Sequence, residues 1–558
     1  MTKSKRILNG VVAGVVAVAA VAPMGAMAAT PVSVTINNSH AGEKYEFYKV
    51  LDVSKSGSNI SYSVDGDFDA FFAGKINGYS GMDAEHKNAA AYNYLNTNST
   101  GGALNRDVAV ALSEYVKTAT PAIKADKSES ADASHNTTTT SLPDLGYYLM
   151  TATAASGVTT TAGFAVQTAD ADGVTINNKN TYTSSDKKIL EGTQKKDATT
   201  KNIGDKVDFG VTLGLPNMTG YENKVCQITD TMSAGLDFDK SGGTSATAVD
   251  KGDVTIKWAN SKSVVDAGNG TKLSEELYDV SLDKGILKVS LKPGAFNVID
   301  AGRGDLDERA IRVTYSAILN EKALVGSGAG NSNQYNLNTV VPTVSNSPTT
   351  TVDGAPSKTK VFTSGFDFDK VTIDPNNGNF GTEKLGGAQF RLEGIEGATV
   401  NGKLIVNGIK VGSTTYTTPT AINVTDNSLS FETIAGKTVS IDGLANGKYT
   451  LTETKAPAGH HFEAATAVTT ITISASNMAA LEANSDNADI KYNSTATGGL
   501  NQAGTAAANG NLNFKVGNST QNKLPSTGAV GGVALAFIGL AAAGAGIGMN
   551  AKKRKVED

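Results

Sequence analysis

The chain has 558 residues, which is a length typical of three or four domains, and it carries 18% charged residues with a formal net charge of -5. This weakly acidic balance provides no broad basic surface, so nucleic acid is not expected as a partner. The single cysteine, Cys226, excludes intramolecular disulfide bonds.

The N-terminus has the pattern of a secretory signal peptide. Basic residues (Lys3, Lys5, Arg6) precede an apolar stretch over 11–21, and small residues surround Met27. This order predicts a signal peptide over residues 1–28 with cleavage after Ala28. We therefore expect an exported protein.

The first expected domain covers residues 29–182. Alternating apolar residues predict strands near 32–36 and 45–53, whereas 82–95 and 104–118 have helical periodicity. The polar stretch 127–140 is expected to be a loop. We predict a β domain with a helical insertion, in a chain whose Thr/Val alternation favours a mainly β fold of tandem β-sandwich domains.

A lysine follows the last strand of this domain. Residues 174–180 read VTINNKN, a strand that runs into an Asn-rich turn and leaves Lys179 exposed. Such a lysine is an amine that an enzyme can reach, although most exposed lysines are simply solvated. Lys187 and Lys188 are the nearest alternatives.

The second expected domain covers residues 183–355. Cys226 alternates in phase with Ile228 and Asp230, which predicts a buried thiol rather than a nucleophile. Lys187 shares its strand face with Ile189, but Lys188 equally shares one with Leu190. Asn336 and Asn338 are two residues apart, so their side chains would point to the same face of a strand and the alternation does not distinguish them.

The third expected domain, 356–520, places three polar groups on apolar strand faces. Lys370 alternates with Phe368, Glu453 with Leu451, and Asn518 with Val516. Burial of an unpaired charge is costly, so these groups are expected to meet. Because burial lowers the pKa of a lysine and raises that of a carboxyl group, a neutral Lys370 amine can attack the Asn518 carboxamide, with Glu453 as the acid that promotes an isopeptide bond.

The C-terminus carries three signals in order over residues 521–558. Leu524, Pro525, Ser526, Thr527 and Gly528 precede an uncharged run, which predicts a transmembrane helix over 529–550. Four basic residues at 552–555 then favour the cytoplasmic side.

Two of these motifs resemble a known family. The pentapeptide 524–528 resembles the LPxTG signal, which a sortase cuts between Thr and Gly. Residues 449–459, YTLTETKAPAG, resemble the E-box of CnaB-type domains in Gram-positive pilins, departing at His460, where Tyr is expected. Together they resemble SpaA/FimA-type major (backbone) pilins, which implies tandem immunoglobulin-like CnaA/CnaB-type domains.

The resemblance also implies site residues. Lys179 corresponds in position to the acceptor lysine of the pilin motif, although Asn177-Asn178 replace Tyr-Pro. In the second domain it implies an isopeptide bond between Lys187 and Asn338, promoted by Asp230.

The expected function is that of a shaft subunit of a sortase-assembled pilus that is anchored to peptidoglycan and supports adhesion. The implied partners are pilin-specific and housekeeping sortases, identical subunits in a covalent polymer, peptidoglycan, minor pilins and host surface ligands. The implied location is the cell wall surface, after a transient stage in the plasma membrane. The alternative is a monomeric wall-anchored adhesin, or a tip or basal pilin.

No enzyme activity, cofactor or metal is expected beyond single-turnover, autocatalytic isopeptide formation. No Ser/His/Asp, Cys/His or metal-binding constellation is visible, and the adjacent His460 and His461 point to opposite faces of a strand. Arg303-Gly304-Asp305 is most simply a polar turn.

Overall fold

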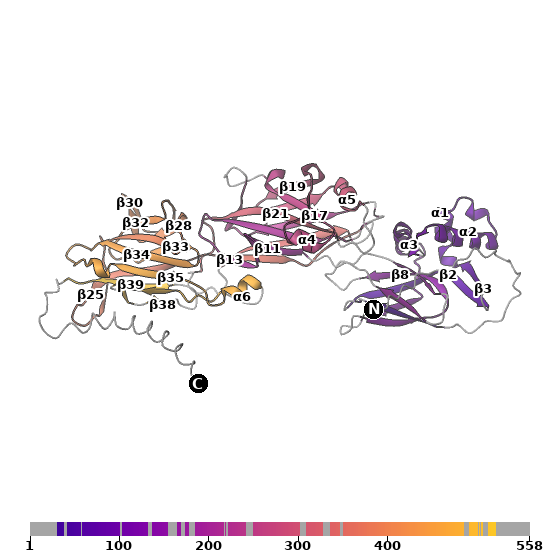
Figure 1. Cartoon of the computed structure of the whole chain (residues 1–558), viewed down its shortest axis with the longest axis horizontal. Coiled ribbons are helices and arrows are strands. Elements are labelled where there is room, and N and C mark those ends of the chain that lie inside the picture. Colours follow the sequence, from indigo (N-terminus) through magenta and orange to yellow (C-terminus); the bar gives the residue numbers. More distant parts are fainter. Residues whose placement is uncertain are drawn as a thin grey trace, which may run out of the picture.

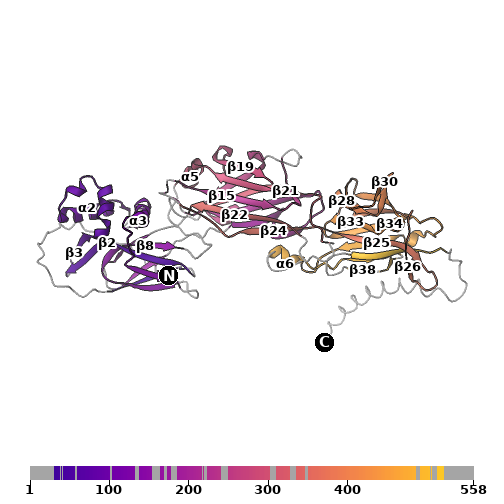
Figure 2. The same cartoon turned by 180° about the vertical axis from the view of Figure 1, so that it is seen from behind.

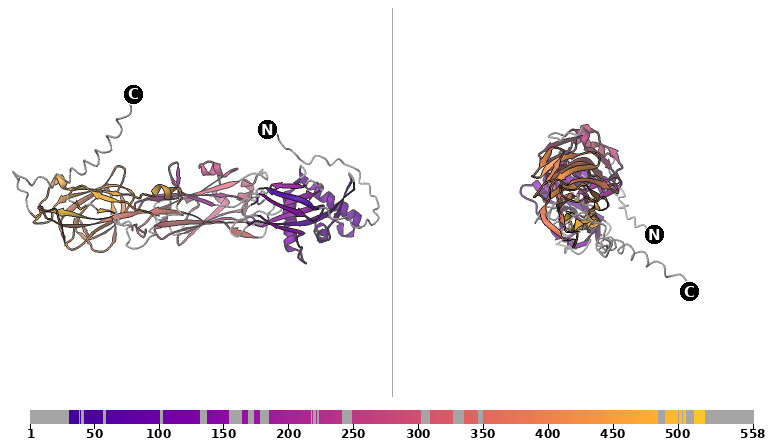
Figure 3. Two further views of the ribbon diagram at one scale, coloured as in Figure 1. Left: turned by 90° about the horizontal axis from the view of Figure 1, so that it is seen from below. Right: turned by 90° about the vertical axis from the view of Figure 1, so that its left-hand side faces the viewer.

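The structure is a computed structural model. It describes residues 31–520, except for residues 38, 40–41, 57–58, 101–102, 132–136, 154–163, 169–172, 178–184, 217, 219–220, 222, 241–248, 302–308, 327–334, 346–349, 485–489, 500, 503 and 506–511. Three β-rich bodies follow one another along the long axis of the molecule (Figure 1, Figure 3). The predicted mainly β fold with tandem sandwiches is confirmed.

The N-terminal body combines two larger sheets and the two-stranded pair β4-β5 with a helical layer. One sheet has the order β10-β1-β7, and the other has the order β3-β2-β8-β9 with β6 paired to β2. The strands are β1 Val32–Asn37, β2 Lys44–Ser56, β3 Asn59–Val64, β4 Ser99–Thr100, β5 Ala103–Leu104, β6 Lys127–Ser130, β7 Thr137–Leu142, β8 Gly146–Thr153, β9 Phe164–Thr168 and β10 Val174–Asn177. The helices are α1 Asp69–Lys75, α2 Ala84–Thr97 and α3 Arg106–Thr118.

The predicted helical insertion is confirmed by α2 and α3. Val108, Leu112 and Val116 of α3 are buried in one cluster, as their helical spacing requires. The expected loop at 127–140 is wrong at both ends, because it contributes β6 and the start of β7. In β7 the threonines alternate between exposed and buried positions, and their β-branched side chains suit a pleated surface despite their polarity.

The central body is a sandwich of two seven-stranded sheets. One sheet has the order β12-β11-β14-β21-β17-β18, with β16 on β21, and the other has the order β13-β24-β22-β15-β20-β19, with β23 on β22. Strands of the first sheet are labelled in Figure 1, and β15, β22 and β24 of the second are labelled in the reverse view (Figure 2). Side chains from both sheets form one apolar core.

The elements of the central body are β11 Ser185–Glu191, β12 Gln194–Lys196, β13 Ala198–Thr200, β14 Lys206–Gly214, β15 Cys226–Met232, β16 Leu236–Phe238, β17 Thr255–Ala259, α4 Lys262–Asp266, β18 Thr271–Lys272, β19 Tyr278–Asp283, β20 Ile286–Leu291, α5 Pro293–Ile299, β21 Ala310–Leu319, β22 Asn336–Ser345, β23 Thr351–Asp353 and β24 Ser357–Phe362. Because β24 pairs with β22, this sandwich continues beyond residue 355, where its end was expected.

The C-terminal body is a second sandwich. Its sheets have the orders β31-β28-β33-β25-β39-β37, with β26 on β25, and β30-β29-β32-β27-β34-β35-β36-β38. The elements are β25 Ser364–Ile373, β26 Phe380–Lys384, β27 Gln389–Ile395, β28 Gly402–Asn407, β29 Ile409–Val411, β30 Thr414–Tyr416, β31 Thr420–Val424, β32 Ser428–Thr433, β33 Val439–Leu444, β34 Gly447–Lys455, β35 Val468–Ile473, α6 Met478–Ala483, β36 Thr495–Thr497, β37 Asn501–Gln502, β38 Gly504–Thr505 and β39 Leu512–Asn518. Single-turn 3-10 helices occupy Gly66–Phe68, Tyr79–Gly81, Lys251–Asp253, Glu275–Leu277 and Ala464–Thr466.

The two sandwiches are in direct contact. Helix α6 of the C-terminal body places Leu481 against Ala198 and Phe362 of the central body. Two ion pairs join the bodies, Lys196 to Glu482 at 3.1 Å and Lys403 to Glu321 at 2.7 Å. Apolar and charged contacts therefore both hold this junction.

Candidate functional site

The C-terminal sandwich brings together the three polar residues predicted from its strand alternation. Lys370 of β25 and Asn518 of β39 lie on adjacent parallel strands of one sheet, where Thr372 is the register partner of Asn518. Glu453 of β34 reaches them from the facing sheet. All three side chains point inward and are buried, with exposed fractions of 1%, 2% and 4% for Lys370, Asn518 and Glu453.

The Glu453 carboxyl group lies between the two nitrogens of this cluster. Lys370 Nζ is 3.4 Å from Glu453 Oε1, and Asn518 Nδ2 donates to Glu453 Oε2 at 3.1 Å. Lys370 Nζ also donates to the carbonyl oxygen of Val516 at 3.4 Å. Within the described residues no donor reaches Asn518 Oδ1, so this buried carbonyl oxygen is free to accept a proton.

The apolar surroundings change the charge state of the pair. Burial lowers the pKa of Lys370 to about 8, although the Glu453 carboxylate opposes this shift. Burial likewise raises the pKa of Glu453 above its ordinary value, against the influence of Lys370. Phe368 and Phe390 pack edge to face nearby in the same core, with ring centroids 5.2 Å apart. Both shifts favour the neutral amine and the neutral acid.

The central sandwich contains a second cluster of the same composition. Lys187 of β11 lies in one sheet, whereas Asp230 of β15 and Asn338 of β22 lie in the other. Lys187 Nζ contacts Asp230 Oδ2, and the three side chains are essentially inaccessible, with exposed fractions of 0% to 1%. The structure therefore brings together the three residues that the family resemblance implied.

The alternatives left open by strand parity lie elsewhere. Lys188 points away from the core and pairs with Asp197 at 2.6 Å. Asn336 Oδ1 instead accepts from the backbone N–H of Leu324 at 2.9 Å. Because Lys187 has no exposed surface, it is also unsuited as an acceptor for an external enzyme, which removes it from the alternatives to Lys179.

Burial dominates the electrostatics of the central cluster as well. It lowers the pKa of Lys187 and raises that of Asp230, while the attraction between the two groups opposes both shifts. The Lys187 nitrogen lies 4.9 Å and 5.0 Å from the ring centroids of Phe209 and Tyr315. Among the described residues, neither Asp230 Oδ1 nor Asn338 Oδ1 has a hydrogen-bond partner.

Tyr315 is a component of this cluster that the sequence reasoning missed. Lys187 Nζ donates to the Tyr315 hydroxyl oxygen at 2.6 Å, and Asn338 Nδ2 donates to the same oxygen at 2.7 Å. Tyr315 occupies an inward position of β21, in phase with the buried Val313 and Ala317. A hydroxyl group on an otherwise apolar strand face was the available signal.

Each cluster thus holds an amine, a carboxyl group and a carboxamide away from water. An amine that has lost its charge is a nucleophile, and a protonated carboxyl group can polarise a carboxamide. The chemistry that this arrangement allows is an attack of the lysine nitrogen on the asparagine carbon.

Several predicted sites lie outside the described residues. These are the signal peptide, Lys179, the pentapeptide 524–528, the apolar run 529–550 and Arg303-Gly304-Asp305. Within the part of the chain that the structure describes, no helix is long and apolar enough to cross a membrane.

Two further predictions concern residues that the structure does describe. Cys226 is buried, as predicted, and burial raises the pKa of its thiol to about 12, which disfavours the reactive thiolate. His460 and His461 lie beyond the end of β34 at Lys455, and neither is in a strand, so the expectation that they point to opposite faces of a strand is wrong. The ring of His460 lies 3.1 Å from Thr372 Oγ1.

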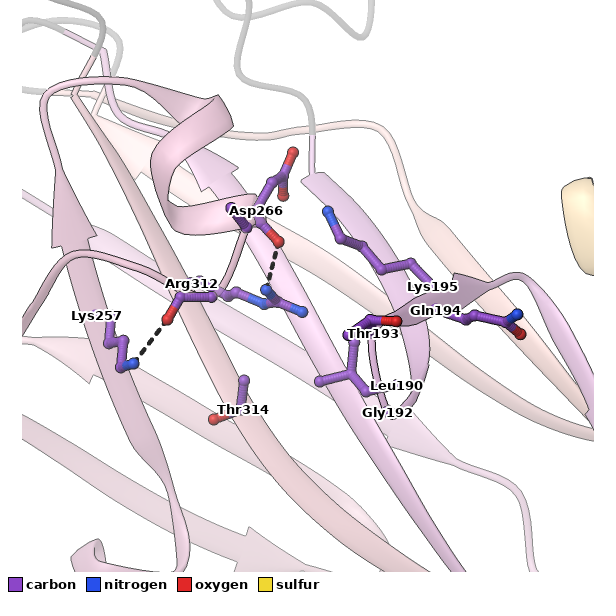
Figure 4. A pocket seen from close by; sticks show the side chains of 11 residues that line it. Leu190, Gly192, Thr193, Gln194, Lys195, Lys257, Asp266, Arg312 and Thr314 are labelled. Carbon is purple, nitrogen blue, oxygen red and sulfur yellow. Dashed lines mark hydrogen bonds between the residues drawn. The ribbon is translucent and has the colours of Figure 1, made fainter.

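A pocket of about 350 Å³ opens beside β21 in the central sandwich (Figure 4). Its basic side chains include Lys195, Lys257 and Arg312. Lys257 Nζ donates to the carbonyl of Gly268 at 2.7 Å, and Arg312 Nη1 donates to that of Asp266 at 2.6 Å. Two of these cations already bind backbone carbonyls, and we assign no chemistry to the pocket.

Comparison with known families identifies two segments. Residues 371–487 match the SpaA family, described as a prealbumin-like fold domain, and residues 518–558 match the LPXTG cell wall anchor motif. The first match contains Glu453 and begins one residue after Lys370. No curated protein matches the chain.

Solved structures of low sequence identity align with most of the chain. The T6 backbone pilin of Streptococcus pyogenes is 15% identical with a TM-score of 0.47, covering 88% of this chain and 99% of its own. The major pilin SpaD of Corynebacterium diphtheriae is 15% identical with a TM-score of 0.43, covering 88% and 98%. BcpA, the major pilin subunit of Bacillus cereus, is 13% identical with a TM-score of 0.38, covering 88% and 99%.

The anchor match fixes where the chain resides. An LPXTG motif implies processing by a sortase and attachment to peptidoglycan, so this is a cell wall-anchored surface protein.

Proposed function

We propose that this chain, with its SpaA-type prealbumin-like domain and its LPXTG anchor, is the shaft subunit of a sortase-assembled pilus. The observation that carries the proposal is the pair of buried lysine, carboxyl and asparagine clusters in two consecutive sandwiches. A protein that is anchored and pulled benefits from covalent reinforcement, and one cysteine offers none through disulfides.

The C-terminal cluster is proposed to form an isopeptide bond between Lys370 and Asn518. The neutral Lys370 nitrogen attacks Cγ of Asn518. Protonated Glu453 donates to Oδ1 of Asn518 after the Asn518 carboxamide flips by about 180° around its Cβ–Cγ bond. A proton then passes from Nζ through the carboxyl group to Nδ2, the Cγ–Nδ2 bond breaks and ammonia leaves with the electron pair, and the proton on Oδ1 returns to Glu453. The protein acts once on itself, so it is not an enzyme in the sense of turnover.

The position of this bond suits a load-bearing subunit. β25 is the first strand of the C-terminal sandwich and β39 is the last, and the two are parallel neighbours. Tension entering at one strand and leaving at the other shears them past each other. A covalent link between Lys370 and Asn518 prevents that sliding before the sheet hydrogen bonds break.

Polymerisation is proposed to use the two ends of the mature chain. A pilin-specific sortase cuts after Thr527 and transfers its carbonyl group to Lys179 of the next identical subunit. A housekeeping sortase finally joins the base of the fibre to peptidoglycan. Minor pilins and host surface ligands complete the proposed set of partners.

The internal bonds are tested by the intact mass of residues 29–527. Each bond releases one ammonia, so the wild-type mass is expected to be about 34 Da below the sequence mass, from two losses of about 17 Da. Peptide mapping assigns the losses to Lys187–Asn338 and Lys370–Asn518. An unchanged mass would exclude both bonds.

The fibre is tested by blotting the wall fraction after boiling under reducing conditions. Wild type is expected to give a ladder of covalent multimers that Lys179→Ala abolishes and Lys188→Ala leaves intact. A ladder that survives Lys179→Ala moves the acceptor to another lysine. A single monomer-sized band in wild type, with the native sortases present, would replace the shaft with a monomeric adhesin or a minor pilin.

A further inference from the structure

The hydroxyl group of Tyr315 lies at the centre of the central cluster. It is 2.6 Å from Lys187 Nζ and 2.7 Å from Asn338 Nδ2. Under the proposed reaction, Nζ is the attacking nitrogen and Nδ2 is the leaving nitrogen. One oxygen atom therefore touches both nitrogens between which a proton must move.

Packing fixes the position of this hydroxyl group. The Tyr315 ring stacks on Phe209 and on Phe238, with centroid distances of 5.5 Å and 5.9 Å. Only 4% of the residue is exposed. A ring held on two sides presents its hydroxyl group in one place, which is what a positioned acid or base requires.

The C-terminal cluster shows why the central cluster needs such a group. Glu453 contacts both Lys370 Nζ and Asn518 Nδ2 through its two oxygens. Asp230 has one methylene less and contacts Lys187, whereas the Asn338 amide nitrogen bonds to Tyr315. The tyrosine thus occupies the place on the leaving nitrogen that the longer carboxyl side chain occupies in the other sandwich.

A second buried tyrosine in the same core shows that this arrangement is not a general way to satisfy a phenol. The hydroxyl group of Tyr278 donates to backbone carbonyl oxygens, those of Lys251 at 3.2 Å and Val254 at 3.1 Å. Tyr315 instead has both reacting nitrogens as partners.

We propose that Tyr315 is a catalytic proton relay for the Lys187–Asn338 bond, an inference that rests on the isopeptide chemistry proposed above. The Lys187 nitrogen attacks Cγ of Asn338 and forms the new C–N bond. Its proton moves to the Tyr315 oxygen as the tyrosine proton, turned toward the leaving group by rotation about the C–O bond, moves to Nδ2. The Cγ–Nδ2 bond breaks, ammonia leaves with the electron pair, and Tyr315 is restored without any oxidation or reduction.

The test follows bond formation after cell-free synthesis of the mature chain, 29–527, using quenched time points and peptide mapping. Tyr315→Phe keeps the stacked ring and removes only the relay oxygen. It is expected to slow the central bond about 100-fold, within the range for general acid–base groups, and to leave the Lys370–Asn518 bond in the same molecule unchanged. Tyr278→Phe is the matched control and is expected to form both bonds at the wild-type rate.

Two measurements separate a relay from a packing role. The central bond should form more slowly in D₂O in wild type, and this isotope effect should shrink in Tyr315→Phe because proton transfer through the hydroxyl group is gone. In an Asn338→Ala background, where no central bond can form, Tyr315→Phe should lower the Tm no more than Tyr278→Phe does. A larger loss of Tm there would assign Tyr315 to packing and overturn the relay.

The remaining outcomes distinguish the inference from the proposed function beneath it. If Tyr315→Phe forms the central bond at the wild-type rate, the relay is wrong while the bond stands. If wild type never forms a bond between Lys187 and Asn338, both the proposed isopeptide chemistry at this site and the proposed role of Tyr315 are wrong.

Discussion

The central and C-terminal sandwiches bury the same three kinds of group in different geometries. In the C-terminal sandwich the lysine and asparagine lie on neighbouring parallel strands of one sheet, and the carboxyl group comes from the facing sheet. In the central sandwich the lysine lies in one sheet, and the asparagine and carboxyl group lie in the other. The proposed Lys370–Asn518 bond would tie two strands together, whereas the proposed Lys187–Asn338 bond would tie two sheets together.

The difference extends to the proton-transfer groups. A glutamate bridges both nitrogens alone, while an aspartate is accompanied by a tyrosine. Burial lowers the pKa of the lysine and raises that of the carboxyl group in both clusters, so the direction of these shifts does not depend on sheet geometry. Both clusters are buried away from water, and the proposed path of the proton differs with the acid.

The largest effect is expected from removing the acid of one cluster. Glu453→Gln keeps the shape of the side chain but provides no carboxyl proton, so the Lys370–Asn518 bond should be absent while the Lys187–Asn338 bond remains. The mature chain should therefore be about 16 Da heavier than wild type by intact mass, because the retained ammonia adds about 17 Da and the substitution itself removes about 1 Da. Glu463→Gln, at an exposed position, is the control. A Lys370–Asn518 bond that still forms in Glu453→Gln would show that this bond does not need the carboxyl proton of Glu453.

The sequence predicted one cluster more fully than the other, for physical reasons. Lys370, Glu453 and Asn518 each interrupt a clear apolar alternation, so their burial follows from the strand period alone. In the central sandwich, adjacent Lys187 and Lys188 satisfy the alternation equally, and only the three-dimensional pairing of strands distinguishes them.

Other features depend on the assembly of the sheets. Tyr315 has the pattern of an ordinary core aromatic residue until strands from the two sheets meet at its hydroxyl group. Strands β6 and β7 escaped prediction because polar residues dominate 127–140 and their pairing to β2 and β1 is long-range. The packing of α6 on the central body is likewise a tertiary contact that local periodicity does not encode.

Equal stability losses are expected when either bond is prevented, despite the different geometries. Lys187–Asn338 and Lys370–Asn518 each close a loop of about 150 residues, for which the model used for disulfides gives roughly 5 kcal/mol. Asn338→Ala and Asn518→Ala should each lower the unfolding free energy of their own domain by about that amount in calorimetry. Asn513→Ala, an exposed position of β39, is the control. Clearly unequal losses would show that strand-to-strand and sheet-to-sheet ties differ in more than loop length.

The titration of the buried lysine should make the unfolding free energy depend on pH only in variants that lack the isopeptide bond. In Asn518→Ala the Lys370 amine remains, with a pKa of about 8 in the folded protein against 10.5 when unfolded. Between these values the unfolded chain binds more protons, so the unfolding free energy should rise with pH from about 8 to about 10.5, by up to about 3 kcal/mol. Denaturant titrations at several pH values measure this rise.

With the proposed bond formed, wild type has an amide at this nitrogen and its unfolding free energy should lack the rise. The double variant Lys370→Met/Asn518→Ala, which has no titrating group there, should lack it as well. The unfolding free energy of Asn338→Ala should also rise with pH, since burial lowers the pKa of Lys187 as well. A slope that persists in the Lys370→Met double variant would assign the titration to other groups.

The smallest predicted effect tests whether the length of the acid side chain decides the need for a tyrosine. Glu453→Asp keeps a carboxyl group but withdraws it by one methylene, so it can no longer contact both Lys370 Nζ and Asn518 Nδ2. Among the described residues no hydroxyl group contacts both of these nitrogens as Tyr315 does in the central sandwich, so the C-terminal bond should form about 30-fold more slowly, about 2 kcal/mol in barrier height. Time-resolved peptide mapping measures the rate, with the central bond as internal reference and Glu463→Asp as control. If Glu453→Asp reacts as fast as wild type, an aspartate alone can transfer the proton between the lysine and asparagine nitrogens. The presence of Tyr315 beside Asp230 would then not be explained by the shorter aspartate side chain.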